Sequence, residues 1–182
     1  MKISREDWLA RGLKLLAVHG PDEIKIDRLC AHLKVTKGSF YHYFANRQAF
    51  IDELLAFWLK QDTEDIITSL ADIADPGARS DALNAIIHQS DLKPEMALRS
   101  WGREEPAVAE AVALVDQRRL DYLTRLISEQ TGSTDQASVL AKLAYAHFVG
   151  CQVLGDLVSQ EEWVSMDRLL NEMVLNQLGG RS

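Results

Sequence analysis

The amino-acid sequence predicts an all-α protein of about nine helices. Three observations lead to this prediction. Apolar residues recur at helical spacing in almost every segment, no segment alternates apolar and polar residues as a strand does, and helix caps and breaks punctuate the chain. Hydrophobic residues make up 47% of the 182 residues, which is enough for a sizeable core and argues against disorder.

The N-terminal part of the chain is predicted to hold several short helices. The first begins after Ser4, which can form a capping box with Asp7, and it carries a stripe of leucines. Gly20-Pro21 is expected to end it. The next helices are expected at about 27–33, at about 37–43 and, as a longer helix, from a cap at Asn46 onward.

The remainder of the chain is predicted to be helical as well, with loops where Pro, Gly, Ser and Asp gather. Breaks are expected at 74–77 ("ADPG"), before Pro106 and at 131–135 ("TGSTD"). The predicted helices lie at about 78–89, around Met96 and Trp101, from Pro106 to about 130, at about 135–158, and from a second capping box at Ser159 and Glu162 to Gly179-Gly180.

Charge is distributed unevenly along the sequence. The whole chain has a net charge of −7, yet residues 1–47 hold nine Lys/Arg and five Asp/Glu, a net charge of +4. Residues 48–182 are acidic, with eleven Lys/Arg and twenty-two Asp/Glu. This asymmetry is typical of a basic binding head on an acidic body.

Other classes of protein find little support in the sequence. No membrane span or signal peptide is expected, so a cytoplasmic location is predicted. No metal-ligand spacing, phosphate-binding loop or paired nucleophile and base is present, so we expect no catalytic residues, no metal and no cofactor. Cys30 and Cys151 are expected to be reduced and buried.

Residues 35–44, "VTKGSFYHYF", combine aromatic and small polar residues in one short helix. Phe40 and Phe44 are four residues apart and are expected to face inward against leucines of the preceding helices. The opposite side is small near its start and can form hydrogen bonds further along. Two short helices joined by a three-residue turn predict a helix-turn-helix, whose second helix enters the DNA major groove by its N-terminal residues.

The stretch "IKIDRLCAHLKVTKGSFYHYFANRQAF" resembles the N-terminal DNA-binding domain of the tetracycline-repressor (TetR) family over about residues 4–60. The helix count is also similar to that family across the whole chain. The resemblance implies a homodimeric regulator, usually a repressor, that a small ligand releases from DNA. The residues that carry it are Val35, Thr36, Gly38, Phe40, Tyr41, Tyr43, Phe44, Asn46, Arg47 and Phe50.

The resemblance implies a DNA-binding domain at residues 1–47 and a helical ligand-binding and dimerisation domain at 48–182. Ser39 and His42 are expected to meet bases, and Tyr41 and Arg47 to meet phosphates. Gly38 is expected to allow close approach of the backbone, and Lys34 in the turn could contact a phosphate. The predicted DNA-binding residues are Lys34, Thr36, Lys37, Gly38, Ser39, Tyr41, His42, Tyr43 and Arg47.

Three positions depart from the family pattern. Lys25 and Asp27 stand near the start of the second helix, where family members often have Thr and Arg. We expect Asp27 to cap its helix, because an acid near phosphates is unfavourable. Lys34 replaces a common turn glycine, so its backbone must adopt a conformation that glycine adopts more easily.

The predicted helix at 135–158 is apolar nearly all round and needs cover on both sides. We expect it to form a four-helix homodimer interface together with the helix at about 160–178, with Gly150 and Gly155 allowing close approach. A buried central helix in a monomer is the alternative.

A small-molecule effector is expected to contact polar and aromatic side chains inside the body. Arg119 could instead pair with Asp116 or Glu104, and His147 could be a satisfied core histidine. The candidate ligand-binding residues are Trp101, Arg119, Tyr122, His147 and Phe148.

The sequence thus favours a ligand-responsive regulator that binds a palindromic double-stranded DNA operator. A helical carrier or enzyme without a DNA role, and a non-specific DNA-packing protein, are the alternatives, and activation in place of repression stays open.

Overall fold

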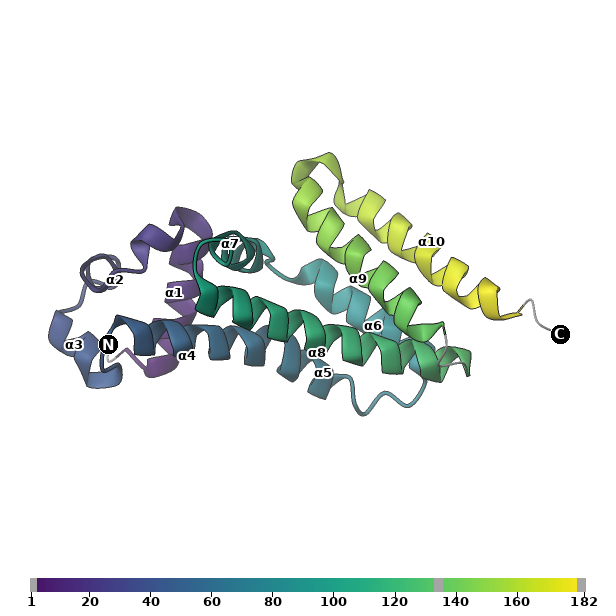
Figure 1. Ribbon diagram of the computed structural model, residues 1–182, viewed down its shortest axis with the longest axis horizontal. Helices are drawn as coiled ribbons and strands as arrows, with labels where there is room; N and C mark the ends of the chain where they lie inside the picture. Colours follow the sequence, from purple (N-terminus) through teal and green to yellow (C-terminus); the bar gives the residue numbers. More distant parts are fainter. Residues whose placement is uncertain (1–2, 133–135, 180–182) are drawn as a thin grey trace. The chain divides into compact units, whose positions relative to one another are not determined.

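The computed structural model of the protein describes residues 3–132 and 136–179, with side chains described as far as residue 173. All regular structure in this range is helical, which confirms the predicted fold class (Figure 1). Nine α-helical runs are present in the described residues when α4 (Arg47–Leu59), the following π turn (Lys60–Glu64) and α5 (Asp65–Ser69) are counted as one.

The described chain divides into two compact units, each built from segments that are not contiguous in sequence. The chain passes between the units three times. The division predicted from the sequence, 1–47 and 48–182, concerns function and stays a prediction. Unit 1 consists of the chain up to Glu64 together with Asp91–Val115, and unit 2 consists of Asp65–Ser90 together with the chain from Asp116 onward.

The helix caps of unit 1 lie largely where the sequence predicts them. Ser4 and Asp7 form the capping box, with the Asp7 amide 3.1 Å from the Ser4 Oγ. Gly20 ends the first helix at φ 78°, and the Asn46 side chain accepts a 2.9 Å hydrogen bond from the Ala49 amide. Besides α4, the helices of unit 1 are α1 (Arg5–His19), α2 (Ile26–Leu33), α3 (Lys37–Tyr43), α7 (Lys93–Trp101) and the first part of α8 (Pro106–Thr131).

One capping prediction is wrong. The N-cap of α2 is Lys25, whose side chain makes no capping hydrogen bond, and Asp27 lies inside the first turn. The Asp27 carboxylate pairs with the Lys37 ammonium instead, because a charged donor is the stronger partner. Thr36 occupies the N-cap of α3, and its side chain makes no capping hydrogen bond there.

Unit 1 has a core built around large aromatic side chains. Trp8, Trp58, Phe40, Phe44 and Phe50 are all at most 1% exposed. The core also draws on chain far beyond the first four helices, since α7 and α8 contribute Leu98, Trp101, Val108 and Val115 to the same cluster.

Two helices of unit 2, α6 (Pro76–Gln89) and α10 (Gln160–Gly179), are also capped by nearby side chains. Asp75 accepts a 2.7 Å hydrogen bond from the Ala78 amide, and Ser159 and Glu162 form the predicted second capping box. Besides α5, α6, α10 and the second part of α8, unit 2 contains α9 (Ala137–Leu154).

One boundary in unit 2 differs from the prediction. The helix expected to reach residue 158 ends at Leu154, because Gly155 has φ 54° and a 3₁₀ turn follows at Gly155–Leu157. Gly155 therefore ends the helix, and its role in close packing with a second chain stays a prediction. The central part of the loop predicted at 131–135 lies outside the described residues.

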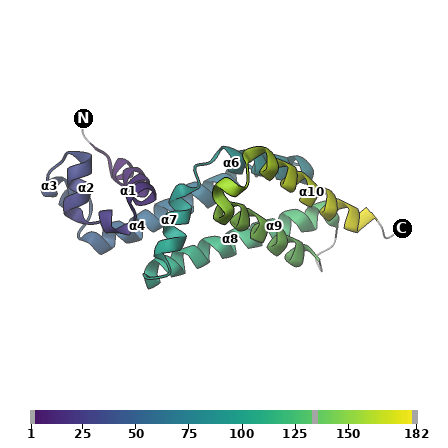
Figure 2. The ribbon, with the colours of Figure 1, turned by 90° about the horizontal axis from the view of Figure 1, so that it is seen from above.

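Helices α9 and α10 lie side by side in unit 2 and run in opposite directions (Figures 1 and 2). By length and composition, one helix of the described range, Ala137–Leu157, is apolar enough to cross a membrane, although it carries Lys142 and Asp156. Little of it is buried within the single chain. An apolar helix that packs against a second chain has the same composition, so this is weak evidence for a membrane span.

Candidate functional site

The helix-turn-helix of unit 1 is held from its inner side by aromatic packing. Phe40 and Phe44, on one side of α3, are 0% and 1% exposed and belong to the cluster that holds the leucines of α1 and α2. The Trp8 ring meets both edge-on, with centroid distances of 5.6 and 6.3 Å. The predicted inward face of this helix is confirmed, and its orientation is fixed from within.

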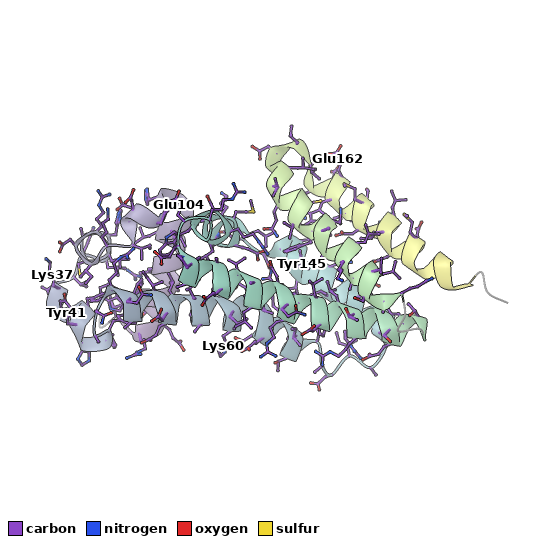
Figure 3. The ribbon with its side chains drawn as sticks, in the orientation of Figure 1. Lys37, Tyr41, Lys60, Glu104, Tyr145 and Glu162 are labelled. Atoms are coloured by element: carbon purple, nitrogen blue, oxygen red, sulfur yellow. The ribbon has the colours of Figure 1, made fainter. Side chains whose placement is uncertain are left out.

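The opposite side of α3 is open to solvent. Ser39 is half-buried, and Tyr41 is 55% exposed although its ring meets Phe40 edge-on at 5.6 Å. Figure 3 shows Lys37 and Tyr41 at the outer edge of the helix. The structure therefore brings one group of predicted DNA-binding residues together on a single exposed edge. Its exposed members are Thr36, Lys37, Gly38, Tyr41 and His42.

The turn between α2 and α3 contains Lys34 in the left-handed conformation, with φ 55°. Among the described residues it is the only one other than glycine with positive φ, which confirms the expected glycine-like backbone. The Lys34 amide donates to the Ala31 carbonyl and the Val35 amide to the Cys30 carbonyl, so the turn is hydrogen-bonded despite the strain. The Lys34 side chain is exposed beside the start of α3.

Tyr43 and Arg47, two other predicted DNA contacts, form hydrogen bonds within the protein. The Tyr43 hydroxyl donates to the Ile3 carbonyl at 2.7 Å, and the Arg47 Nε donates to the Ile24 carbonyl at 2.5 Å. Both side chains are half-buried. These bonds brace α3 and α4 against the start of the chain and the loop before α2, so a substitution at either position would disturb the fold as well as any DNA contact.

The Asp27–Lys37 ion pair was not predicted from the sequence. The Asp27 Oδ1 lies 2.5 Å from the Lys37 Nζ, and both side chains are more than half exposed. The hydrogen bond and the charge of Asp27 raise the pKa of Lys37. The two residues are ten positions apart on different helices, and no sequence spacing signals such a contact.

The candidate ligand-binding residues do not all lie in the same unit. Trp101 is 6% exposed in the core of unit 1, while Arg119, Tyr122, His147 and Phe148 belong to unit 2. The Arg119 guanidinium lies 5.7 Å from the centroid of the Phe148 ring. The Tyr122 hydroxyl is buried, has no hydrogen-bond partner among the described atoms, and burial raises its pKa.

Sequence reasoning missed a polar cluster that includes His147. The Asp167 carboxylate bridges two imidazoles, with 2.8 Å to the His147 Nε2 and 2.6 Å to the His88 Nε2. These three half-buried groups come from α6, α9 and α10. His147 thus has internal partners, in agreement with the alternative that it is a satisfied core residue.

Cys151 lies beside this cluster, with its Sγ 3.7 Å from the His147 Nδ1. Burial, and then the charge of Asp167, raise the pKa of the Cys151 thiol, which keeps it protonated and unreactive. Both cysteines are free and buried, which confirms that prediction. Within the described residues, no group of three His, Cys, Asp or Glu side chains could hold a metal ion.

Asp167→Ala is expected to lower the free energy of unfolding by about 3 kcal/mol, because it leaves two largely buried imidazoles without their acceptor. Urea unfolding followed by circular dichroism at fixed protein concentration measures the change. Glu172→Ala, at an exposed position on the same helix, is the matched control and should stay within about 0.5 kcal/mol of the wild type. Equal losses in the two variants would contradict the clamping role of Asp167.

Gln152 is a second residue that sequence reasoning missed. Both its side-chain nitrogen and its side-chain oxygen are buried without a hydrogen-bond partner among the described atoms. An amide buried in this way costs free energy unless something satisfies it. No periodicity could have found it, because a glutamine on an apolar helix reads as a solvent-facing residue.

Large apolar side chains of the α9–α10 hairpin are exposed to solvent. Leu143 on α9 is 48% exposed, and Leu169 and Met173 on α10 are each 59% exposed. A hollow of about 660 Å³ next to them is lined by Leu157, Met166 and Leu169 together with polar residues of the capping box. The exposed large apolar side chains of this hairpin are Val139, Leu143, Val153, Leu154, Leu157, Val164, Met166, Leu169 and Met173, and this set is called the hairpin surface below.

Comparison with known proteins finds a similarity to one family within the first four helices. Residues 9–54 match the family model of "Bacterial regulatory proteins, tetR family". No curated protein matches the sequence.

Solved structures similar to this chain share its fold over nearly the whole length. A TetR-family transcriptional regulator from Streptomyces coelicolor is 17% identical with a TM-score of 0.79, covering 96% of this chain and 89% of its own. A protein from Saccharomonospora viridis, assigned as a transcriptional regulator and solved in complex with choline, is 16% identical with a TM-score of 0.74, covering 93% and 94%. Escherichia coli NemR in its reduced form is 18% identical with a TM-score of 0.67, covering 96% and 94%.

Proposed function

We propose, from the premise that residues 9–54 form an N-terminal domain of the tetR family of bacterial regulatory proteins, that this protein is a ligand-responsive transcriptional repressor. It acts in the cytoplasm on double-stranded operator DNA. The observation that carries the proposal is the two-sided character of α3, whose aromatic side is buried to 0–1% while its small, polar and cationic edge is exposed. An edge of this kind fits a major groove.

The DNA-binding residues proposed here are the nine predicted from the sequence. In this proposal Lys34 neutralises a phosphate, and His42 and Ser39 contact base edges. Tyr43 and Arg47 also hold α3 and α4 in position through the hydrogen bonds described above. If a dimer neutralises about eight phosphates, the logarithm of the DNA association constant should fall with the logarithm of the salt concentration at a slope near −7.

The hairpin surface supports a homodimer formed by α9 and α10. The exposed large apolar side chains of these two helices favour burial against a second copy. Around Gly150 nothing lies within 4 Å of the position that a Cβ would take, so a helix of the partner can come close there. Two recognition helices about 34 Å apart then read successive major grooves of a palindromic site.

The effector is a small molecule that unit 2 binds. The buried, unpartnered polar groups of Tyr122 and Gln152 would gain hydrogen bonds from a ligand, and Phe148 with Arg119 supplies an aromatic and cationic surface. The similar protein solved with choline is an example of this fold holding a small molecule. The dimer is proposed to exchange between a conformation whose two DNA-binding domains fit the operator and one whose domains do not. A ligand that binds the second conformation more tightly increases its population and ends repression.

The proposal predicts different effects for Lys34→Gly and His42→Ala. Lys34→Gly relieves the strain of the left-handed backbone, so the fold should be kept. The slope of log K for DNA binding against log salt concentration should become shallower by about 0.9 for each lysine removed, on DNA of any sequence. His42→Ala should leave that slope unchanged and lower the preference for the selected base at one position per half-site by about tenfold. Fluorescence anisotropy at several salt concentrations, with a duplex that the protein selects from a random pool and with random-sequence duplex, measures both.

The wild type must prefer the selected duplex for the proposal to hold. If both variants bind the two duplexes as the wild type does, α3 is not the recognition helix. If the wild type itself binds neither duplex, the protein has no DNA role of the proposed kind.

A further inference from the structure

Asp27 lies at the surface that α3 offers to DNA, although acidic residues repel phosphates. Its carboxylate lies 2.5 Å from the ammonium of Lys37, the first residue of α3. The side chains of Asp27 and Lys37 are 71% and 62% exposed, so the pair is an external bridge between α2 and α3. Since the proposed groove-facing edge begins at this turn of α3, the carboxylate reaches the same surface.

The two lysines that flank the start of α3 differ in their surroundings. Within the part of the chain that the structure describes, no carboxylate pairs with Lys34, whereas Lys37 is held by Asp27. The other acids near α2 have their own partners, with Asp22 bound to Lys25 and Glu23 bound to Arg28 and His32. Among these acids, Asp27 is therefore the one that holds Lys37.

We propose that Asp27 is a specificity-determining residue, which keeps Lys37 from DNA that offers only phosphates and releases it to DNA that offers base-edge acceptors. The inference rests on the proposed function and names a determinant of its selectivity. Asp27 would then lower the affinity for non-specific DNA more than it lowers the affinity for the operator.

The physical reason lies in what replaces the carboxylate as the partner of Lys37. A phosphate gives the ammonium an equivalent charged acceptor but adds a negative charge beside Asp27, so the exchange gains little. A guanine edge is neutral and offers O6 and N7 together, and the cytosine of the same pair offers an amino group that a carboxylate can accept from. A G·C pair can thus receive both members of the ion pair.

The experiment measures DNA affinity against salt concentration for the wild type, Asp27→Asn, Lys37→Ala and the double variant. The two duplexes are one selected by the wild-type protein and one of random sequence. In Asp27→Asn, the slope on random DNA should steepen by about 0.9 for each protomer, because Lys37 is now available to phosphates. The preference for the selected duplex should fall roughly tenfold, and the steeper slope should disappear in the double variant.

Asp52→Asn is the matched control, because it removes one exposed carboxylate from α4 of the same unit, where Asp52 accepts from Gln48 and not from a lysine. If it steepens the slope as much as Asp27→Asn does, net charge accounts for the effect and the inference is overturned. A double variant that keeps the steeper slope would overturn it as well.

A measurement without DNA separates this inference from the proposed function. Asp27→Asn should lower the pKa of Lys37 in the free protein, as followed by NMR titration of its ammonium group. An unchanged pKa would show that the pair does not form and would overturn the inference, even in a wild-type protein that prefers its selected duplex. A wild type with no such preference would overturn the proposed function itself.

Discussion

Replacing Leu169 with glutamate is expected to convert the proposed dimer into monomers and to abolish operator binding. Leu169 is 59% exposed on α10 and lines the hollow beside the 3₁₀ turn. In a two-fold interface each substitution occurs twice, so two carboxylates would have to be buried without partners. The dimer dissociation constant should rise by about 100-fold or more, and sedimentation equilibrium over a range of protein concentrations measures it.

Val18→Glu is the matched control for this change. Val18 is 71% exposed on α1 and lies outside the hairpin surface, so a glutamate there should leave the dimer intact. Circular dichroism of both variants checks that the helices are retained. A Leu169→Glu protein that dimerises as tightly as the wild type would rule out the hairpin surface as the dimer interface.

Phe40→Ala is expected to lower the free energy of unfolding by about 3–5 kcal/mol, which is the usual cost of removing a fully buried phenylalanine ring. The ring is 0% exposed and lies within 6 Å of the ring centroids of Trp8, Phe44 and Phe50. Because these residues also fix the orientation of α3, DNA binding should fail together with the fold. Thermal and urea unfolding at fixed protein concentration measure the loss.

Tyr41→Ala, the adjacent exposed position, separates packing from DNA contact. It should change the free energy of unfolding by well under half as much as Phe40→Ala, and weaken DNA binding nonetheless. Phe40→Leu, which keeps most of the buried volume, should retain both the fold and the DNA preference at low temperature. Equal destabilisation by Phe40→Ala and Tyr41→Ala would mean that the two sides of α3 are assigned wrongly.

Features that depend on a few neighbouring residues were predictable from the sequence. The capping boxes at Ser4 and Ser159 and the cap at Asn46 all depend on residues within four positions. The inward side of α3 followed from the four-residue spacing of its phenylalanines. Local spacing and cap chemistry were enough in each case.

Features that depend on contacts between distant segments could not be predicted. The bridge from Asp167 to His88 spans 79 positions, and the Asp27–Lys37 pair joins two helices whose relative placement the sequence does not state. That Gly155 ends a helix is visible only in its positive φ. The choice of partner for a charged side chain is set by tertiary packing, and period and propensity carry no signal of it.

The core of unit 1 is completed by residues that come long after its first four helices. Leu98, Trp101, Val108 and Val115 join the cluster that contains Trp8 and Trp58. A chimaera that fuses only residues 3–64 to a foreign body would lack these four side chains and leave this core incomplete. Transplanting unit 1 onto another protein therefore requires residues 91–115 to travel with it, as a second, discontinuous insert in the recipient gene.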